Sequence, residues 1–401
     1  MTGTAWTSAG MSEPATARGR QLRERGMDQE RPTIDTWQDP PFNRWTFSHV
    51  DEFVTSVSIS TGRERSQKAV NDLDAFSGKV PELERRLAQT WTDVILVVHE
   101  DRIVGEWYGE GSRPDDRHLL MSVSKSICGI VVGALADDGL IEPSRTVAHY
   151  IPELAESAYG TATVQQVLDM TVAVEYLEEY ADLNSHVRAH DRVAGWRTRF
   201  DTDPRDTHEF LMGLRPAGEH GKVFQYCSAN TDVLAWLVEV VTGKRYHEVV
   251  GERVWSRLDA QSDARITVDS SGFAFANGGI SCTARDLAGV GRLMLAGGEF
   301  DGRRIVSDGW VRATMAGGDP EAARGLPYQD IHPNGSYKNH WWATGNERGS
   351  VYAVGIHGQY VWLDPPTRTV IVKFSSAPEA LGRTMNSDHA RLFQELCAAL
   401  E

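Results

Sequence analysis

One stretch of the chain, Met121–Asp138 (MSVSKSICGIVVGALADD), limits the possible folds more than any other. It contains an unbroken run of apolar and small residues, Ile127–Ala136, and predicts a helix that ends at Gly139, a residue type that favours helix C-termini. A helix that is apolar on all sides is stable only when other elements cover it. The run is too short to span a bilayer. We therefore expect this helix at the centre of a layered fold.

Ser122 and Lys125 stand at the start of this helix, and no other serine in the chain has a lysine three residues on. Residues i and i+3 share a helix face, so the hydroxyl and the amine can meet. The positive end of the helix dipole favours an alkoxide at Ser122 and disfavours an ammonium, and the apolar residues that follow desolvate Lys125. Because both effects lower a lysine pKa, the pair predicts a serine nucleophile with lysine as its proton acceptor.

Other catalytic and cofactor-binding patterns are missing from the sequence. It contains no G-x-S-x-G nucleophile elbow, no HExxH zinc motif and no phosphate-binding P-loop. The histidines show no clear metal-ligand spacing. The four cysteines are far apart, so we expect buried, reduced thiols rather than a disulfide framework or a zinc site. The sequence thus predicts neither a metal nor a cofactor.

Strand patterns occur towards both ends of the chain, and helical patterns fill the middle. The strand segments are residues 94–99, 103–108, 359–363 and 370–374. The helical segments are residues 81–89, 164–170, 208–214, 231–241, 283–296 and 389–400. This order predicts an α+β fold, with an antiparallel sheet flanked by helices and an all-helical insertion. We expect a flexible tail at 1–35, a discontinuous α/β domain at 36–143 and 251–401, and a helical domain at 144–250.

The net charge of −15 argues against a nucleic-acid partner, because such a chain repels phosphate groups. The N-terminal residues contain no apolar stretch that could serve as a signal peptide, so we expect a cytoplasmic protein that does not contact a membrane. The expected partner is a small-molecule substrate. The sequence leaves the oligomeric state open, with a homodimer as one option.

Ser122-x-x-Lys125, then Tyr226-Cys227-Ser228 and a glycine-rich segment near the C-terminus, resembles the serine β-lactamase and penicillin-binding-protein superfamily. The resemblance extends over most of the chain and implies an active site between an α/β domain and an all-helical domain. One motif departs from the β-lactamase pattern, because Gly355-Ile356-His357-Gly358 stands in the region of the usual Lys-Thr-Gly. That lysine helps to hold the substrate carboxylate, so its absence argues against β-lactam turnover.

Within that superfamily, the sequence further resembles the 6-aminohexanoate-dimer hydrolases, which act on nylon oligomers. The stretches that carry this likeness are residues 117–126, 190–199, 224–236, 275–286 and 355–365. The likeness implies that Ser122 attacks the amide carbonyl, that Lys125 accepts the serine proton, and that Tyr226 relays it to the leaving amine. It also implies an oxyanion hole formed by the backbone N–H groups of Ser122 and Ile356.

The same likeness implies a set of substrate-binding residues. Asp191 takes a position that faces the amino end of the substrate, where a carboxylate suits a terminal ammonium. Tyr180 matches a tyrosine that closes over the substrate, Asn277 matches a pocket-lining position, and Ser228 replaces the asparagine of the lactamase motif. Trp196 could form an apolar wall for a methylene chain, and a core position is an equal alternative. Most other carboxylates near Asp191 we interpret as a solvated loop.

Four functions are compatible with these residues. The first is hydrolysis of linear amides such as 6-aminohexanoate oligomers, with esterase activity, through an acyl-enzyme. The second is a carboxylesterase with an unrelated natural substrate, since an alkoxide leaves more easily than an amine. The third, a β-lactamase or D-Ala-D-Ala peptidase, is disfavoured by the missing Lys-Thr-Gly. A ligand sensor is the non-enzymatic alternative, and it is disfavoured because Ser122, Lys125 and Tyr226 are all present.

Overall fold

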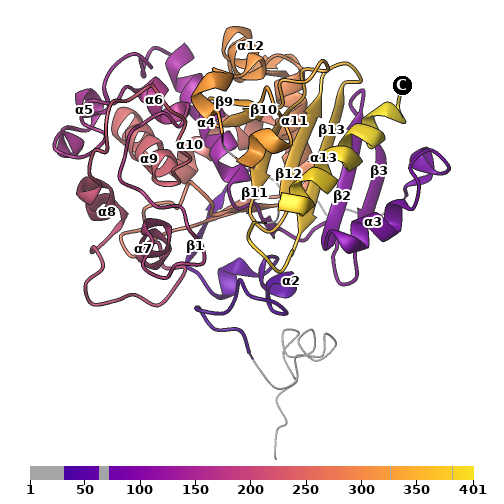
Figure 1. Cartoon of the computed structure of the whole chain (residues 1–401), viewed down its shortest axis with the longest axis horizontal. Helices are drawn as coiled ribbons and strands as arrows, with labels where there is room; N and C mark the ends of the chain where they lie inside the picture. The colour runs from indigo at the N-terminus through magenta and orange to yellow at the C-terminus, as the bar shows by residue number, and fades with distance from the viewer. Residues whose placement is uncertain (1–30, 63–71, 326, 382) are drawn as a thin grey trace, which may run out of the picture.

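A computed structural model of the chain describes residues 31–62, 72–325, 327–381 and 383–401. Its largest sheet has seven antiparallel strands in the order β3-β2-β13-β12-β11-β10-β9 (Figure 1). The strands are β2 (Thr92–His99), β3 (Arg102–Tyr108), β9 (Ser336–Lys338), β10 (Trp341–Ala343), β11 (Val351–Gly355), β12 (Gln359–Asp364) and β13 (Thr369–Ser375). Because β13 pairs with β2 along its length, strands from both halves of the chain meet in one sheet, which confirms the predicted antiparallel sheet.

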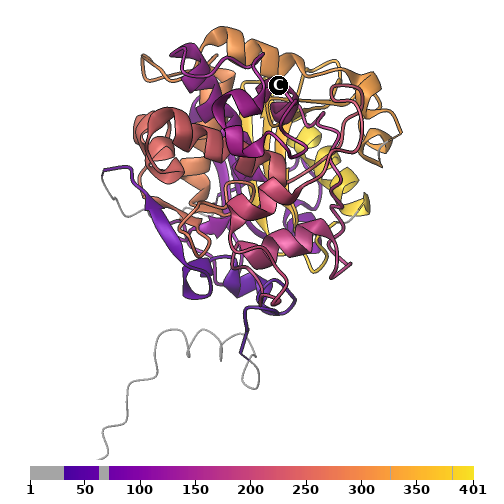
Figure 2. The same ribbon diagram turned by 90° about the vertical axis from the view of Figure 1, so that its left-hand side faces the viewer.

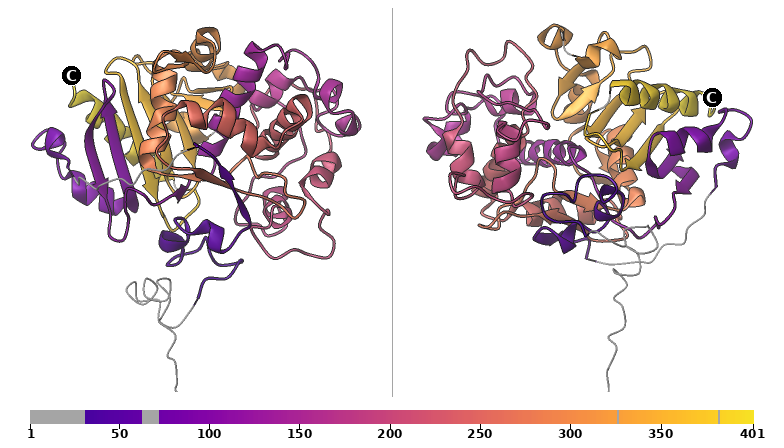
Figure 3. Two further views of the ribbon diagram at one scale, coloured as in Figure 1. Left: turned by 180° about the vertical axis from the view of Figure 1, so that it is seen from behind. Right: turned by 60° about the horizontal axis from the view of Figure 1, so that its bottom comes forward.

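Helices cover both faces of this sheet. Successive side chains of a strand point to opposite faces, and the apolar residues of the central strands therefore need cover on both. The buried even-numbered residues of β2 share a core with helix α11 (Ala284–Leu295). The odd-numbered residues at 95 and 97 face the opposite core, under α3 (Leu83–Gln89) and α13 (Arg383–Ala398). Figure 1 shows α13 across the front of the sheet, and the left view of Figure 3 shows the other face from behind. The strands are therefore buried on both sides.

Helices α5 to α10 form the side of the molecule away from β2 and β3 (Figure 1). They are α5 (Val147–Tyr150), α6 (Val164–Leu168), α7 (His186–Val193), α8 (Thr207–Gly213), α9 (Ala229–Thr242) and α10 (Tyr246–Arg253). The helical patterns predicted at 164–170, 208–214 and 231–241 correspond to α6, α8 and α9. One buried apolar cluster runs from the sheet into these helices. The boundaries of a separate helical domain at 144–250 stay a prediction.

Helix α4 (Val123–Asp137) is buried along nearly its whole length, as its apolar sequence predicts. Two glycines allow its close packing. A Cβ atom at Gly129 would lie 2.2 Å from the Asn339 carbonyl oxygen, and one at Gly133 would lie 2.5 Å from the indole nitrogen of Trp310. The helix stops before Gly139, whose φ of +75° suits glycine. This packing leaves α4 no room to shift, so the residue that precedes it, Ser122, is held in place.

A second, four-stranded sheet has the order β1-β5-β6-β4, and the sequence analysis did not anticipate it. Its strands are β1 (Ser56–Ile59), β4 (His118–Leu119), β5 (Ala264–Thr267) and β6 (Ile280–Cys282). Such short strands carry almost no alternation to detect. In Figure 2, β1 is the indigo strand at the edge of the molecule. The remaining elements include α2 (Asn43–Thr46), β7 (Glu299–Phe300), β8 (Arg303–Arg304) and α12 (Asp308–Ala316).

Several expectations concern the chain as a whole. Residues 1–30 of the predicted tail lie outside the described residues. At the end of the predicted tail, the Asp35 carboxylate accepts hydrogen bonds from the backbone N–H and the hydroxyl of Thr198. All four cysteines are buried and free. Within the described ranges, no helix is both long and apolar enough to cross a membrane, and no cluster of acidic, His and Cys side chains could hold a metal ion. The cytoplasmic location and the homodimer stay predictions.

Lys373 on β13 is a buried cation that the sequence analysis did not single out. Its side chain is fully buried, and the ammonium donates to the Thr90 carbonyl at 3.2 Å and to the Ser375 hydroxyl. Burial lowers the Lys373 pKa to about 7, and attraction to Asp93 opposes this shift. The protonated side chain is therefore a source of instability in the folded state near neutral pH.

We expect Lys373→Met to stabilise the fold near pH 7, with a gain that shrinks as the pH rises. The folded pKa lies below the unfolded value of about 10.4, so between these values the unfolded chain binds more protons and wild-type stability increases with pH. Urea unfolding at pH 7 should show a gain on the order of 1–3 kcal/mol, which narrows towards pH 10. Lys222→Met, at an exposed lysine, is the control. A gain that is independent of pH would contradict the prediction.

Candidate active site

Ser122 precedes the first residue of α4, and Lys125 follows within the first turn. Lys125 Nζ donates to Ser122 Oγ at 2.7 Å and to the main-chain oxygen of Asn277 at 2.7 Å. Burial lowers the Lys125 pKa to about 8, and the Glu178 carboxylate is the largest opposing influence. At pH 7 about a tenth of such a lysine is the free base, which can accept a proton. The structure thus brings the predicted nucleophile and base into direct contact.

The backbone just before Ser122 has an unusual conformation. Met121 has a φ of +49°, which is sterically unfavourable for a residue with a side chain. Its side chain is buried in an apolar cluster with Trp196 and Phe275, and this packing can hold the strained conformation. The turn from β4 into α4 is therefore fixed, and it places Ser122 on the wall of a cleft.

Tyr226 lies near Ser122 in the segment before α9, and the Ser122 side chain acts to lower the Tyr226 pKa. The Tyr226 ring stacks on Trp342, with centroids 5.9 Å apart, and its centroid lies 5.2 Å from Lys125 Nζ. Burial, followed by the nearby Glu178 carboxylate, raises the Tyr226 pKa well above its usual value. The phenol therefore keeps its proton and can act as a donor, whereas Lys125 is the group able to accept.

Most of the predicted site residues border one cleft, which contains about 330 Å³ of space not filled by atoms. They are Ser122, Tyr180, Asp191, Trp196, Ser228, Asn277 and Ile356. Lys125 donates to Ser122, and neither Lys125 nor Tyr226 is among the residues that border the cleft. Part of this space is open to solvent. The other residues on the walls were not predicted as site residues, and they are Gln38, Met121, Val187, Phe275 and Gly278.

Glu178 connects two of the predicted substrate residues. Its Oε1 accepts hydrogen bonds from the Tyr180 hydroxyl at 2.6 Å and from Ser228 Oγ at 2.6 Å, and its Oε2 accepts from the Ser228 backbone at 2.9 Å. Glu175 and Glu179 nearby are exposed, as expected for a solvated loop. Glu178 is the exception, because its carboxylate ties the loop that carries Tyr180 to the start of α9.

Asp232, a fully buried carboxylate on α9, holds Asn277 in place. It accepts hydrogen bonds from the Asn277 backbone at 3.0 Å and from the Asn277 amide at 2.6 Å, and His190 Nε2 lies 2.9 Å from its Oδ2. Since the Asn277 carbonyl accepts from Lys125, Asp232 fixes the group that orients the lysine. Asp232 was not predicted from the sequence, although a lone acidic residue before the apolar run Val233–Val238 was a usable signal.

Asp191 borders the cleft between two arginines. Arg188 Nη1 lies 3.7 Å from its Oδ2, and Arg197 Nε lies 3.6 Å from the same oxygen. Burial raises the Asp191 pKa, and the charges of Arg197 and Arg188 oppose this shift. A ligand cation at this carboxylate would share it with two guanidinium groups.

The position of Trp196 is compatible with both roles that the sequence left open. It borders the cleft and is also almost fully buried, with a side-chain exposure that leaves only an edge available. Its indole nitrogen donates to Thr267 Oγ1 at 2.9 Å, and its ring packs edge-on against Trp37 and Phe275, with centroid distances of 5.3 Å and 4.9 Å. Trp196 is therefore a rigid part of the cleft wall.

Ile356 lies in the turn between β11 and β12, next to the backbone of Ser122. A Cβ atom at Gly355 would lie 2.5 Å from the Leu120 carbonyl oxygen and 3.0 Å from the Ser122 nitrogen. Only glycine permits this approach without displacing one of the two segments. The approach brings the backbones of Ile356 and Ser122 close together, which is the arrangement that a pair of oxyanion donors needs.

Comparisons with known proteins agree with this geometry. Residues 82–394 match the Beta-lactamase family model. A 6-aminohexanoate-dimer hydrolase from Paenarthrobacter ureafaciens is 52% identical over 372 residues, covering 92% of this chain and 94% of that protein. A provisionally named 6-aminohexanoate-dimer hydrolase structure from Bacillus anthracis has a TM-score of 0.82 at 29% identity, over 92% of this chain and 97% of that one. A family VIII carboxylesterase, with a TM-score of 0.60 at 17% identity over 84% and 99% of the two chains, shares the fold. The chain therefore belongs to the beta-lactamase family, the superfamily of serine hydrolases that its sequence resembles.

Proposed function

We propose that this chain hydrolyses linear amides such as 6-aminohexanoate oligomers, and also short acyl esters, through an acyl-enzyme on Ser122. The observation that carries the proposal is the 2.7 Å hydrogen bond from Lys125 Nζ to Ser122 Oγ on the wall of a cleft. The 52% identity to a 6-aminohexanoate-dimer hydrolase supports the substrate class. A natural role in nylon-oligomer degradation is part of the same proposal.

In the proposed reaction, free-base Lys125 takes the Ser122 proton as Oγ bonds to the substrate carbonyl carbon. The carbonyl oxygen becomes an oxyanion, which the backbone N–H groups of Ser122 and Ile356 stabilise. The C–N bond then breaks, and the proton on Lys125 passes through the Tyr226 hydroxyl to the leaving amine. Water next attacks the acyl carbon and gives its proton to Lys125, which returns it to Ser122 as the acid leaves.

The segment at residues 355–358 stands in the region of the lactamase Lys-Thr-Gly and contains no cationic side chain that could replace that lysine. Burial lowers the His357 pKa to about 4, and its Nδ1 lies 2.7 Å from the Ala377 carbonyl oxygen. A neutral imidazole bound to the main chain cannot pair with a substrate carboxylate as a lysine does. This observation counts against a β-lactamase or D-Ala-D-Ala peptidase. A carboxylesterase with an unrelated natural substrate is the alternative, since the same groups suffice for an ester.

The proposal is tested by assaying the 6-aminohexanoate dimer and a p-nitrophenyl ester with purified protein. Wild type should hydrolyse both, and Ser122→Ala and Lys125→Ala should each lower both turnover rates by roughly a thousandfold or more, because the two groups act as a unit. Ser126→Ala on the same helix is the control, since its hydroxyl donates to the His340 carbonyl and should not affect turnover. Most of the activity surviving in Ser122→Ala would refute the mechanism. Hydrolysis of the ester alone would favour the carboxylesterase.

Asp191→Asn should weaken hydrolysis of the dimer and spare the simple ester. The dimer carries a terminal ammonium, which Asp191 is proposed to bind, and the ester carries none. A charged hydrogen bond of about 1.5–3 kcal/mol corresponds to a loss of roughly 10- to 150-fold in kcat/KM. Measuring both substrates on the same variant preparation supplies the control. An equal loss on both would mean that Asp191 only holds Arg188 and Arg197, and no loss would mean that another group, with Glu178 the first choice, binds the ammonium.

The pH dependence should follow the ionisation of Lys125. Since only the free base accepts a proton, kcat/KM should rise through about pH 8 and be about a hundredfold below its plateau at pH 6. The Glu178 charge raises the Lys125 pKa, so Glu178→Gln should move the midpoint to lower pH. Glu179→Gln, at the exposed neighbour, should leave the midpoint unchanged. A midpoint shift towards higher pH in Glu178→Gln would show that the lysine is not the titrating base.

A further inference from the structure

The turn that carries Ile356 is short and has a constrained backbone. Gly355 and Gln359, which flank it, are paired across β11 and β12. His357 and Gly358 have left-handed φ values of +62° and +93°. The Gly358 N–H donates to the Gly355 carbonyl oxygen at 3.3 Å. That carbonyl belongs to the same planar peptide unit as the Ile356 N–H, so this bond sets the direction of the proposed oxyanion donor.

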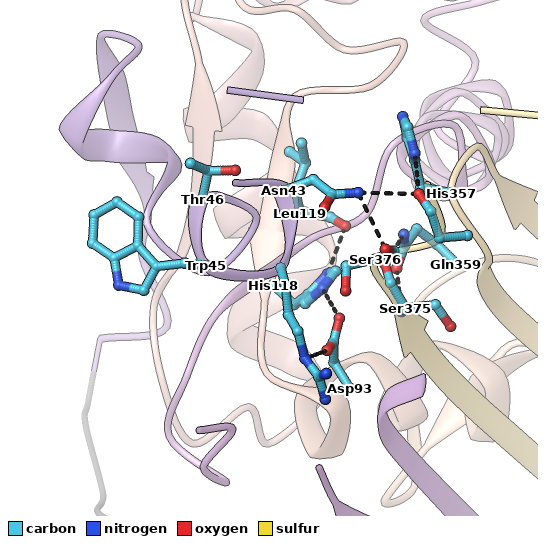
Figure 4. Close-up of polar contacts among 12 residues, drawn as sticks. Asn43, Trp45, Thr46, Asp93, His118, Leu119, His357, Gln359, Ser375 and Ser376 are labelled. Atoms are coloured by element: carbon cyan, nitrogen blue, oxygen red, sulfur yellow. Dashed lines mark hydrogen bonds and ion pairs between the residues drawn. The ribbon is translucent and has the colours of Figure 1, made fainter. Parts of the chain in front are cut away.

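A buried glutamine holds the other side of Ile356. Gln359 Nε2 donates to the Ile356 carbonyl at 3.3 Å and to the Ser375 carbonyl at 2.7 Å, and its Oε1 accepts from the Ser375 backbone at 3.1 Å. Its side chain is fully buried. One side-chain amide therefore links the turn to the end of β13, as the pairing of Gln359 with Ser375 in Figure 4 illustrates. The peptide units on both sides of Ile356 are thus fixed by hydrogen bonds.

The segment at the end of β13 is itself anchored, so the link leads to a rigid support. The buried Asn43 amide donates to the Ser376 carbonyl at 3.1 Å and to the Ala377 carbonyl at 3.0 Å. His357 contacts the same Ala377 carbonyl, and the Ala377 N–H donates to the His357 carbonyl at 3.1 Å. Figure 4 shows Asn43 and His357 on either side of this segment. A change at Gln359 would therefore free the Ile356 carbonyl, while His357 stays bonded to the support.

We propose that Gln359 is a positioning residue for the oxyanion hole. It fixes the Ile356 carbonyl and, together with the bond from the Gly358 N–H to the Gly355 carbonyl, keeps the Ile356 N–H directed at the oxygen of the tetrahedral intermediate. This inference rests on the proposed function of the site. Gln359 is not among the residues that border the cleft, so it acts through Ile356 and not on the substrate. Because amides and esters both form an oxyanion, loss of Gln359 affects both substrates equally, unlike loss of the Tyr226 proton donor, which affects the amine leaving group.

The decisive variant is Gln359→Met, which keeps a side chain of similar length and removes both hydrogen-bonding groups. We expect kcat to fall about 10- to 100-fold on the dimer and on a p-nitrophenyl ester, with KM changed less than about threefold. The affinity for a boronic acid, which forms a tetrahedral anion on Ser122, should fall by the same factor as kcat/KM. Tyr226→Phe, measured in parallel, should slow the amide far more than the activated ester.

Ser375→Ala is the matched control within the same buried cluster. It removes the hydroxyl that accepts from Lys373 and leaves both main-chain bonds to Gln359 in place, so it should keep the wild-type kcat. If Gln359→Met does not fold, Gln359→Asn replaces it, because its amide is one methylene too short to span the same partners. The expected loss in kcat is the same.

Three results would overturn the inference. They are a wild-type kcat in a folded Gln359 variant, a loss confined to KM or thermal stability, and an equal loss of kcat in Ser375→Ala. The outcome is separable from that of the proposed function. An active Ser122→Ala enzyme would remove the function itself. An inactive Ser122→Ala enzyme beside a fully active Gln359→Met enzyme would remove only the role of Gln359.

Discussion

The desolvation of Lys125 is the constraint on which the rest of the site depends. A lysine ammonium in water stays protonated near neutral pH. Burial at the start of α4 lowers the Lys125 pKa to about 8. The carboxylates of Glu178 and Asp232 oppose this shift by attraction. Hydrogen bonds to Ser122 Oγ and to the Asn277 carbonyl direct the amine at the nucleophile. The pKa of the proposed base is therefore set by two opposing effects, burial in an apolar helix and attraction to two carboxylates from other segments.

The fold secures this balance by close backbone packing around α4. Gly129 lets the helix approach the segment before β10, and Gly355 lets the turn after β11 approach the residues before Ser122. Met121 is held in a left-handed conformation between these contacts. A buried, tightly packed helix cannot slide or rotate without opening voids. The position of Ser122 is therefore fixed by packing on several sides, and the strain at Met121 is tolerated because of it.

The sequence predicted the parts of the molecule whose signals are local. Ser122 and Lys125 are three residues apart on one helix, and β2, β3, β12 and β13 are long enough to show their patterns. Glu178 and Asp232 could not be placed in the same way, because their roles arise from contacts with segments about 50 residues away along the chain. Nothing in the spacing of Glu178 distinguishes it from the exposed Glu179 beside it. The second sheet escaped prediction because its strands are too short to show periodicity.

The proposed nucleophile and the proposed substrate-contacting groups come from differently constrained parts of the fold. Ser122 and Ile356 belong to segments packed against α4 and the large sheet, whereas Tyr180 and Asp191 come from the loop before α7 and from α7 itself. Glu178 joins these parts through its bonds to Tyr180 and Ser228. Under the proposed function, a change in the loop can therefore alter substrate recognition without moving the serine or the lysine. The family VIII carboxylesterase keeps this fold at 17% identity, which shows how much sequence change the rigid framework tolerates.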